Sequence, residues 1–303
     1  MPKIKKDLSG ENITEKDLTK EIVDEAFPNL KPFFSTIVDI LRILDNEKVF
    51  LNVLSENILK DERLTALVLA KANSFFYGFH GKITTINQAL LVLGLREIRN
   101  IVLSCLIDDC FPDENSISSL MRKKSFLMGI CCKYLSQVLF ANDTETHSEM
   151  QILGMIHELG SIILMNSRYS EEYKNFILES LRESYSVYEV IDYENKKFQT
   201  NHVKVAVEFM KRWKFPQVYI DVFSLHVLSV KDCFGMENVD ENLMKKVCIL
   251  KLADRLCSFS FSTSEKKNGN IDEISFLIDY LNLGRYEFLQ LVRNIIVCQY
   301  AFS

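Results

Sequence analysis

The chain has 303 residues, 48% of them hydrophobic, so it is long enough to bury one large core or two smaller ones. Its 36 basic and 41 acidic residues give a formal net charge of −5, and the basic residues occur in short, scattered groups such as 122–124. A general nucleic-acid-binding protein needs a more continuous positive surface, so this charge balance excludes that class.

The N-terminus and the cysteines indicate a cytoplasmic protein. Residues 1–7 lack the apolar run of a signal peptide, and no later segment has the length and apolar character of a membrane span. No two cysteines have the Cys-x-x-Cys spacing, and most lie among apolar residues, so we expect buried, reduced thiols. The eight cysteines are at positions 105, 110, 131, 132, 233, 248, 257 and 298.

Apolar residues at helical spacing predict helices from the start of the chain. Residues 15–26 are predicted to form a charged amphipathic helix that ends at Phe27–Pro28. A second helix is predicted to begin after Pro32, and two more are predicted over 51–59 and 64–72.

A capping box is predicted at Thr85–Gln88, where Thr85 would cap the helix and Gln88 would bond back to it. Gly94 is predicted to end the short helix that follows, because glycine is the usual residue at a helix C-terminus. Residues 95–107 then form a strongly apolar predicted helix. A DNA-reading helix-turn-helix is an alternative here, but the second helix is too apolar to lie in a groove, so we expect it in a core.

A polar segment, 108–119, divides the chain into two predicted helical subdomains. No alternating strand pattern competes with the helical one, so the sequence predicts an all-α protein. We expect a charged helical extension (1–28), an N-terminal helical subdomain (29–115) and a second helical subdomain with C-terminal helices (116–303). The helices of the second subdomain are predicted near 120–139, 149–165, 170–184, 201–213, 216–229, 241–259, 271–281 and 285–300.

The pair His157–Glu158 is the candidate for chemistry, because it places an imidazole and a carboxylate inside the apolar helix predicted over 149–165. Neighbouring polar side chains in such a helix can hold a metal, transfer a proton or form a polar cluster in a core. Which of these applies decides whether the protein is an enzyme.

Several ordered sequence blocks over roughly residues 29–260 match a family pattern, and the most specific of them, 83–100, contains Gln-Ala, Leu-Gly-Leu and Arg-Asn. Their order resembles the HDOD family, bacterial regulatory proteins built on the HD phosphohydrolase fold. The resemblance implies that the second subdomain is a degenerate HD-like helical bundle. The other blocks are 30–35, 71–78, 153–164, 201–216 with His226, and 252–255.

By this resemblance, catalytic HD enzymes hold a divalent metal with a first His, an adjacent His-Asp pair and a distant Asp. The pair falls on His157 and Glu158, the distant carboxylate on Asp254, and the first His on Lys124. A protonated lysine only donates hydrogen bonds and repels a cation. Glutamate in place of aspartate adds a methylene, which displaces its oxygen beyond the tolerance of a metal site.

Three arrangements of these residues are open. In the first, which we favour, Lys124 pairs with Glu158 or Asp254 in a buried ionic cluster. In the second, His157, Glu158 and Asp254 bind a metal weakly, with His202 or His226 as an added ligand. A purely structural role is the alternative for these two histidines, as a helix cap or in a hydrogen bond within the core. The third gives the cleft to a small signal whose anionic group contacts Lys124.

The resemblance implies a regulatory protein that acts in signal transduction through protein–protein contacts, without phosphohydrolase activity, bound metal or cofactor. The extension before Pro28 and the helices after residue 260 are candidate partner surfaces, because they are amphipathic. The alternatives are a metal-dependent phosphohydrolase or cyclic-dinucleotide phosphodiesterase with altered ligands, and a sensor module for a nucleotide or other small anion. No nucleic-acid or membrane partner is expected.

Overall fold

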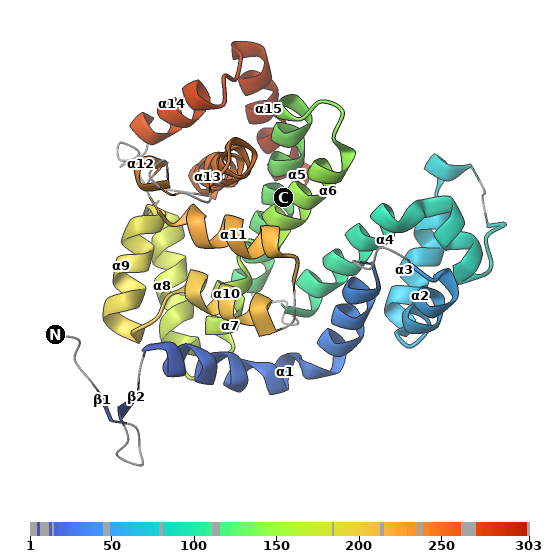
Figure 1. Ribbon diagram of the computed structural model, residues 1–303, viewed down its shortest axis with the longest axis horizontal. Helices are drawn as coiled ribbons and strands as arrows, with labels where there is room; N and C mark the ends of the chain where they lie inside the picture. The colour runs from blue at the N-terminus through green and yellow to red at the C-terminus, as the bar shows by residue number, and fades with distance from the viewer. Residues whose placement is uncertain are drawn as a thin grey trace. The chain divides into compact units, whose positions relative to one another are not determined.

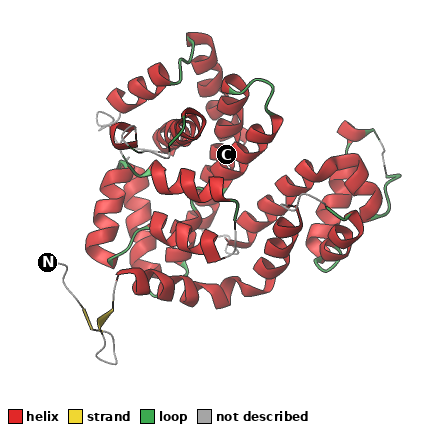
Figure 2. Ribbon diagram, in the orientation of Figure 1, coloured by secondary structure: helices red, strands yellow, loops and turns green. Residues whose placement is uncertain are grey.

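The computed structural model describes residues 5–6, 12–13, 15–44, 49–78, 81–110, 116–183, 185–212, 215–228, 230–233, 236, 239–261 and 271–301. These residues are almost entirely helical, as predicted, and the one strand pairing is a two-residue antiparallel contact of β1 with β2 (Figures 1 and 2). None of the described helices has an apolar stretch long enough to cross a bilayer.

The backbone contacts divide the chain into two compact units: the small unit, Asn29–Glu114, and the large unit, Met1–Pro28 with Asn115–Ser303. The small unit holds the second part of α1 (Glu15–Leu44), then α2 (Leu51–Ile58), α3 (Glu62–Ala72), the 3-10 turn η1 (Phe75–Tyr77) and α4 (Ile86–Cys110). The large unit holds β1 (Lys5–Lys6), β2 (Asn12–Ile13), the first part of α1, and the following helices: α5 (Ser116–Leu139), α6 (Thr144–Met155), α7 (Leu159–Met165), α8 (Ser170–Glu183), α9 (Val187–Phe198), α10 (His202–Arg212), α11 (Gln217–His226), α12 (Val230–Cys233), α13 (Glu241–Phe261), α14 (Ile271–Tyr280) and α15 (Arg285–Ala301).

Helix α1 is continuous through Phe27 and Pro28, so the prediction that a helix ends there was wrong. A proline inside a helix loses one hydrogen bond and costs about 3 kcal/mol. Apolar burial on both sides of the prolines offsets that cost: Ile22 and Ala26 are fully buried before them, and Ile37 and Ile40 after them. The tertiary core therefore overrides the local helix-breaking signal.

The first part of α1 is tied to the rest of the large unit. Its apolar face is buried, Thr19 and Thr200 share a hydrogen bond of 2.9 Å, and Arg168 pairs with Glu21 and Glu25. The apolar face that we considered as a partner surface before Pro28 is therefore already in use within the chain.

Gly94 breaks α4 as the sequence predicted, with φ 73° and ψ 161°. The predicted capping box at the start of α4 is also present: Gln88 N donates to Thr85 Oγ1, and Thr85 N donates to Gln88 Oε1, both at 3.3 Å. Only glycine adopts the Gly94 backbone conformation readily.

Replacing Gly94 by alanine is therefore expected to lower the free energy of unfolding by about 1–3 kcal/mol, the usual cost of a side chain in this region of backbone space. Urea unfolding of the full chain measures the change. Ala89→Gly in the same helix makes the reverse change, from alanine to glycine, at a position with ordinary helical geometry, and it is expected to lower the free energy of unfolding by about 1 kcal/mol. An unchanged stability of Gly94→Ala would contradict the backbone argument.

The helix predicted over 149–165 is interrupted, and this correction shapes the site. Helix α6 ends at Met155, α7 begins at Leu159, and the three residues between them form a turn. Glycines on either side allow close packing: a Cβ on Gly154 would collide with the backbone of Met128, and one on Gly160 with the backbone of His202. His157 and Glu158 thus lie at a helix junction pressed against α5 and α10, not inside a helix.

The six cysteines whose side chains are described, at 105, 131, 132, 233, 248 and 257, are buried free thiols, as expected. Cys110 and Cys298 lie outside the residues whose side chains the structure describes, and so do Trp213 and Lys214 of the block 201–216.

Candidate functional site

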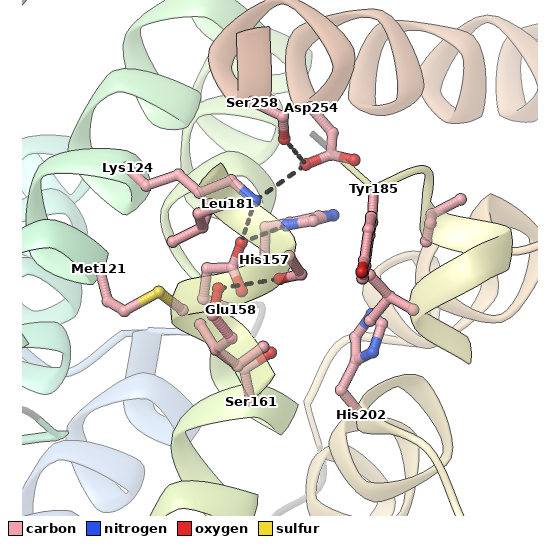
Figure 3. Close-up of a pocket in the computed structure, with 14 residues that line it drawn as sticks. Met121, Lys124, His157, Glu158, Ser161, Leu181, Tyr185, His202, Asp254 and Ser258 are labelled. Carbon is pink, nitrogen blue, oxygen red and sulfur yellow. Dashed lines mark hydrogen bonds and ion pairs between the residues drawn. The ribbon is translucent and has the colours of Figure 1, made fainter. Parts of the chain in front are cut away.

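Three parts of the large unit bring the candidate residues together. Lys124 lies on α5, His157 and Glu158 in the turn between α6 and α7, and Asp254 on α13. Helix α5 packs against both α6 and α13, so its side chains meet the turn and α13 at the same place. Figure 3 shows the side chains of Lys124, Glu158 and Asp254 pointing toward one another.

An ion-pair cluster forms the centre of the site. Lys124 Nζ lies 2.6 Å from Glu158 Oε1 and 3.2 Å from Asp254 Oδ1, and all three residues are buried. Ser258 Oγ donates to the same Asp254 oxygen at 3.4 Å. The ammonium group thus neutralises one of two carboxylates that would otherwise repel each other, and burial strengthens both attractions.

The pKa values of the cluster show how strongly the three charges depend on one another. Burial alone would lower the pKa of Lys124, but the attraction of Glu158 and Asp254 outweighs it, and the pKa lies above its ordinary value. Burial would raise the pKa of Glu158 and of Asp254, but Lys124 lowers both well below the usual range. All three groups are therefore charged across the physiological pH range.

These shifts predict a pH dependence of stability. A carboxylate with a lowered pKa stabilises the fold above its unfolded pKa, and the contribution is lost as pH falls toward the folded pKa. A lysine with a raised pKa contributes below its unfolded pKa, and this is lost only as pH rises through the folded value. We expect the contribution of Glu158, Asp254 and Lys124 to the free energy of unfolding to be constant from about pH 5 to 10 and to fall below about pH 4. Urea unfolding at a series of pH values below 5 tests this, and a stability that rises as the pH is lowered through that range would contradict it.

Two histidines adjoin the cluster. His157 Nε2 and His226 Nε2 are 3.0 Å apart, so one donates and the other accepts, and the rings meet edge to face. Burial, followed by the proximity of His157, lowers the pKa of His226 well below its ordinary value, so His226 is neutral. Among the described residues, neither His157 Nδ1 nor His226 Nδ1 has a hydrogen-bond partner, although His157 Nδ1 lies 3.5 Å from Glu158 Oε1.

A second polar group positions His202 at the start of α10. The fully buried Glu194 accepts hydrogen bonds from His202 Nδ1 at 2.7 Å, from His202 N at 3.0 Å and from the Tyr173 hydroxyl at 2.6 Å. Burial would lower the pKa of His202, but the attraction of Glu194 outweighs it and raises the pKa. His202 thus carries a paired imidazole whose Nε2 atom is not used by Glu194.

Glu194, which holds His202 in place, was not predicted from the sequence, because α9 was not predicted. Tyr173 lies on α8, a predicted helix, but its hydrogen bond to Glu194 was not predicted either. A signal was present: Ser186 and Glu189 form a capping box that opens α9, with hydrogen bonds of 3.2 and 2.7 Å. Nothing in the local sequence, however, indicates that Glu194 faces His202 and Tyr173.

A cavity of about 50 Å³ adjoins these groups. Its polar lining includes Lys124, Glu158, Asp254 and His202. Figure 3 shows His202 and Tyr185 across the pocket from Lys124 and Glu158. An engineered cavity of about 150 Å³ is large enough for benzene, so this one fits a ligand of only a few non-hydrogen atoms.

The residues present do not fit the metal site of a catalytic HD enzyme. The Lys124 ammonium lies against an oxygen of each carboxylate that such a cation would need, and it would repel the cation. His157, His226 and Asp254 do offer three possible ligand atoms within 4.8 Å of one another. In the structure, however, the Nε2 atoms of the two histidines already share a hydrogen bond, and the Asp254 carboxylate already pairs with Lys124.

Comparison with known families identifies the fold. The family model described as HDOD domain matches residues 30–227, about two thirds of the chain. The chain belongs to the HDOD family. An HDOD domain protein with unknown function from Geobacter sulfurreducens is 19% identical, with a TM-score of 0.62 over 92% of this chain and 98% of that one.

Two other solved structures share the HDOD architecture. A candidate signal transduction protein from Marinobacter aquaeolei VT8 is 17% identical, with a TM-score of 0.62 over 95% of this chain and 65% of that one. A candidate phosphohydrolase from Shewanella amazonensis SB2B is 16% identical, with a TM-score of 0.59 over 92% of this chain and 98% of that one. At these identities the likeness establishes the fold alone. No curated protein matches the chain.

Proposed function

We propose that this HDOD protein is a non-catalytic regulatory protein that acts through contacts with other proteins. The observation that supports the proposal is the position of Lys124 Nζ, which lies 2.6 Å from Glu158 and 3.2 Å from Asp254. A metal-dependent phosphohydrolase needs a cation here to activate water and to neutralise the phosphate. Lysine provides a fixed positive charge, but it does not lower the pKa of a bound water as a metal does.

Exposed apolar residues on the C-terminal helix support the part of the proposal that concerns protein contacts. On α15, Tyr286, Leu289, Ile296 and Val297 are exposed at helical spacing, the first of them at 69%. Such a stripe is typical of a surface that another protein covers. A similar structure is named for signal transduction, which agrees with a regulatory role.

The proposal predicts little bound metal and no phosphodiester turnover. We expect elemental analysis of the purified protein to find much less than one equivalent of iron, manganese or zinc per chain. A generic phosphodiester substrate, tested with each metal added, should give the same rate with wild-type protein as with His157→Ala. Stoichiometric metal together with turnover that His157→Ala abolishes would overturn the proposal.

A metal-dependent phosphohydrolase is the second candidate, because His157, His226 and Asp254 lie close enough together to bind a cation weakly. It requires Lys124 to leave the cluster, since its ammonium group contacts Asp254. A nucleotide sensor has less support, because Lys124 is already paired with two carboxylates and the cavity of about 50 Å³ would have to widen greatly. We also propose a cytoplasmic location, which the buried free thiols favour.

A further inference from the structure

Charged and apolar side chains together line the cavity beside the Lys124 cluster. The charged lining residues are Lys124, Glu158 and Asp254, and Met121 and Leu181 lie next to them (Figure 3). The apolar lining consists of Met121, Ile177, Leu181, Val187 and Val190. A ligand that fits must therefore combine a polar head with a few carbon atoms.

The charges at this cavity favour a cationic head. Glu158 and Asp254 at the cavity, and Glu194, which pairs with His202 and does not itself line the cavity, contribute three negative charges. Lys124 contributes one positive charge, and His202 contributes a second when it is protonated. The group is therefore negative by one charge with His202 protonated and by two with it neutral. Other nearby cations are engaged elsewhere: Arg255 pairs with Glu273, and Lys251, which does not line the cavity, donates to the His226 carbonyl.

Unused acceptor atoms give the same indication. Lys124 contacts Glu158 through Oε1 and Asp254 through Oδ1, and no described residue donates a hydrogen bond to Glu158 Oε2 or Asp254 Oδ2. His202, more than nine-tenths buried, also lines the cavity, and its Nε2, which accepts a hydrogen bond when the imidazole is neutral, has no partner within the described chain. Acceptor atoms of buried residues that reach a cavity without a protein partner favour a ligand or water there.

We propose that this cavity binds a small primary ammonium ion. Its nitrogen would lie toward Glu158 Oε2 and Asp254 Oδ2, and its carbon atoms would contact the apolar lining residues. A primary ammonium supplies one positive charge and three N–H donors, which match the charge and the acceptors. The volume of about 50 Å³ limits the ligand to roughly the size of ethylammonium. The inference rests on the ion-pair cluster on which the proposed function also depends. The two can fail separately: bound metal with turnover would overturn the proposed function, whereas the absence of a Tm rise with ethylammonium would overturn this inference alone.

The test is thermal unfolding of the full chain in EDTA with ethylammonium chloride, and with equal concentrations of tetramethylammonium chloride or sodium chloride as controls. Ethylammonium is expected to raise Tm saturably, by about 2–4 °C once its concentration is about five times Kd. Tetramethylammonium has the same charge but no N–H donor and is larger, so it should raise Tm no more than sodium does.

Variants distinguish the cavity from a general salt effect. Val190→Phe enlarges a lining side chain that takes no part in the ion pairs and should abolish the response, whereas Val190→Ala should shift the preference toward butylammonium. Asp254→Asn leaves Lys124 its closer partner Glu158 and should weaken binding at least tenfold. No response of the wild-type protein, an equal response to tetramethylammonium, or an unchanged response in Val190→Phe would overturn the proposal.

Discussion

Replacing Lys124 by methionine is expected to lower the free energy of unfolding by about 3–5 kcal/mol at pH 7. The substitution keeps most of the side-chain volume but leaves Glu158 and Asp254 as two buried carboxylates without their common counter-ion. Removing one partner of a buried ion pair costs more than the pair contributes, because the remaining charge is neither solvated nor paired. Urea unfolding of the full chain measures the loss.

The pH dependence of this variant should differ from that of the wild-type protein. Without Lys124, burial and mutual repulsion raise the carboxylate pKa values above those of the unfolded chain, so the variant should gain stability as pH falls from about 8 to 5. In the wild-type protein the contribution of the two carboxylates should stay constant over this range and fall only below about pH 4, because Lys124 keeps both pKa values low.

Two controls test the electrostatic explanation. Lys123→Met removes a neighbouring charge that is only partly buried, and it should change stability by no more than about 0.5 kcal/mol. Combining Lys124→Met with Glu158→Gln and Asp254→Asn removes all three charges and should recover most of the lost stability. A loss below about 1 kcal/mol in Lys124→Met would show that the cluster is not a buried ionic unit.

The sequence predicted the helical class well because apolar spacing and capping reflect local physics. The capping box at Thr85 and the break at Gly94 depend only on residues a few positions apart, and both were predicted correctly. Phe27–Pro28 was misread as a helix end, since the burial that keeps α1 continuous involves residues distant in the chain. The turn at 156–158 was missed for a related reason: tight contacts of Gly154 and Gly160 with other helices accompany it.

The candidate site was less predictable than the fold. Periodicity alone does not bring Lys124, Glu158 and Asp254 together, because they lie on separate elements; only the family resemblance suggested their proximity. Neither periodicity nor resemblance indicated that His157 bonds to His226, 69 positions away, or that Glu194 holds His202. The first pairing joins the α6–α7 turn to α11 and the second joins α9 to α10, and sequence spacing does not encode such tertiary packing.

Replacing Lys124 by histidine is expected to raise the affinity of this site for a divalent metal. The change removes the ammonium that repels a cation and supplies a neutral imidazole where, by the HDOD resemblance, catalytic HD enzymes have their first His. His157, His226 and Asp254 already present ligand atoms within 4.8 Å of one another. We expect elemental analysis to find about one equivalent of manganese, iron or zinc per chain, and Tm to rise by about 5–10 °C at a metal concentration of about 100 times Kd.

The matched variants separate a restored site from adventitious binding. Adding His157→Ala to Lys124→His removes one ligand and should abolish both the bound metal and the Tm rise, whereas the wild-type protein should show neither. Adding Glu158→Asp shortens the side chain by the methylene that distinguishes it from the catalytic pattern, and it should tighten metal binding further. Because Lys124 is the group that occupies the space between the two carboxylates, its replacement should matter more than any change among the remaining ligands. If Lys124→His binds no metal even with Glu158→Asp, the geometry of the helices opposes metal binding here more than Lys124 does.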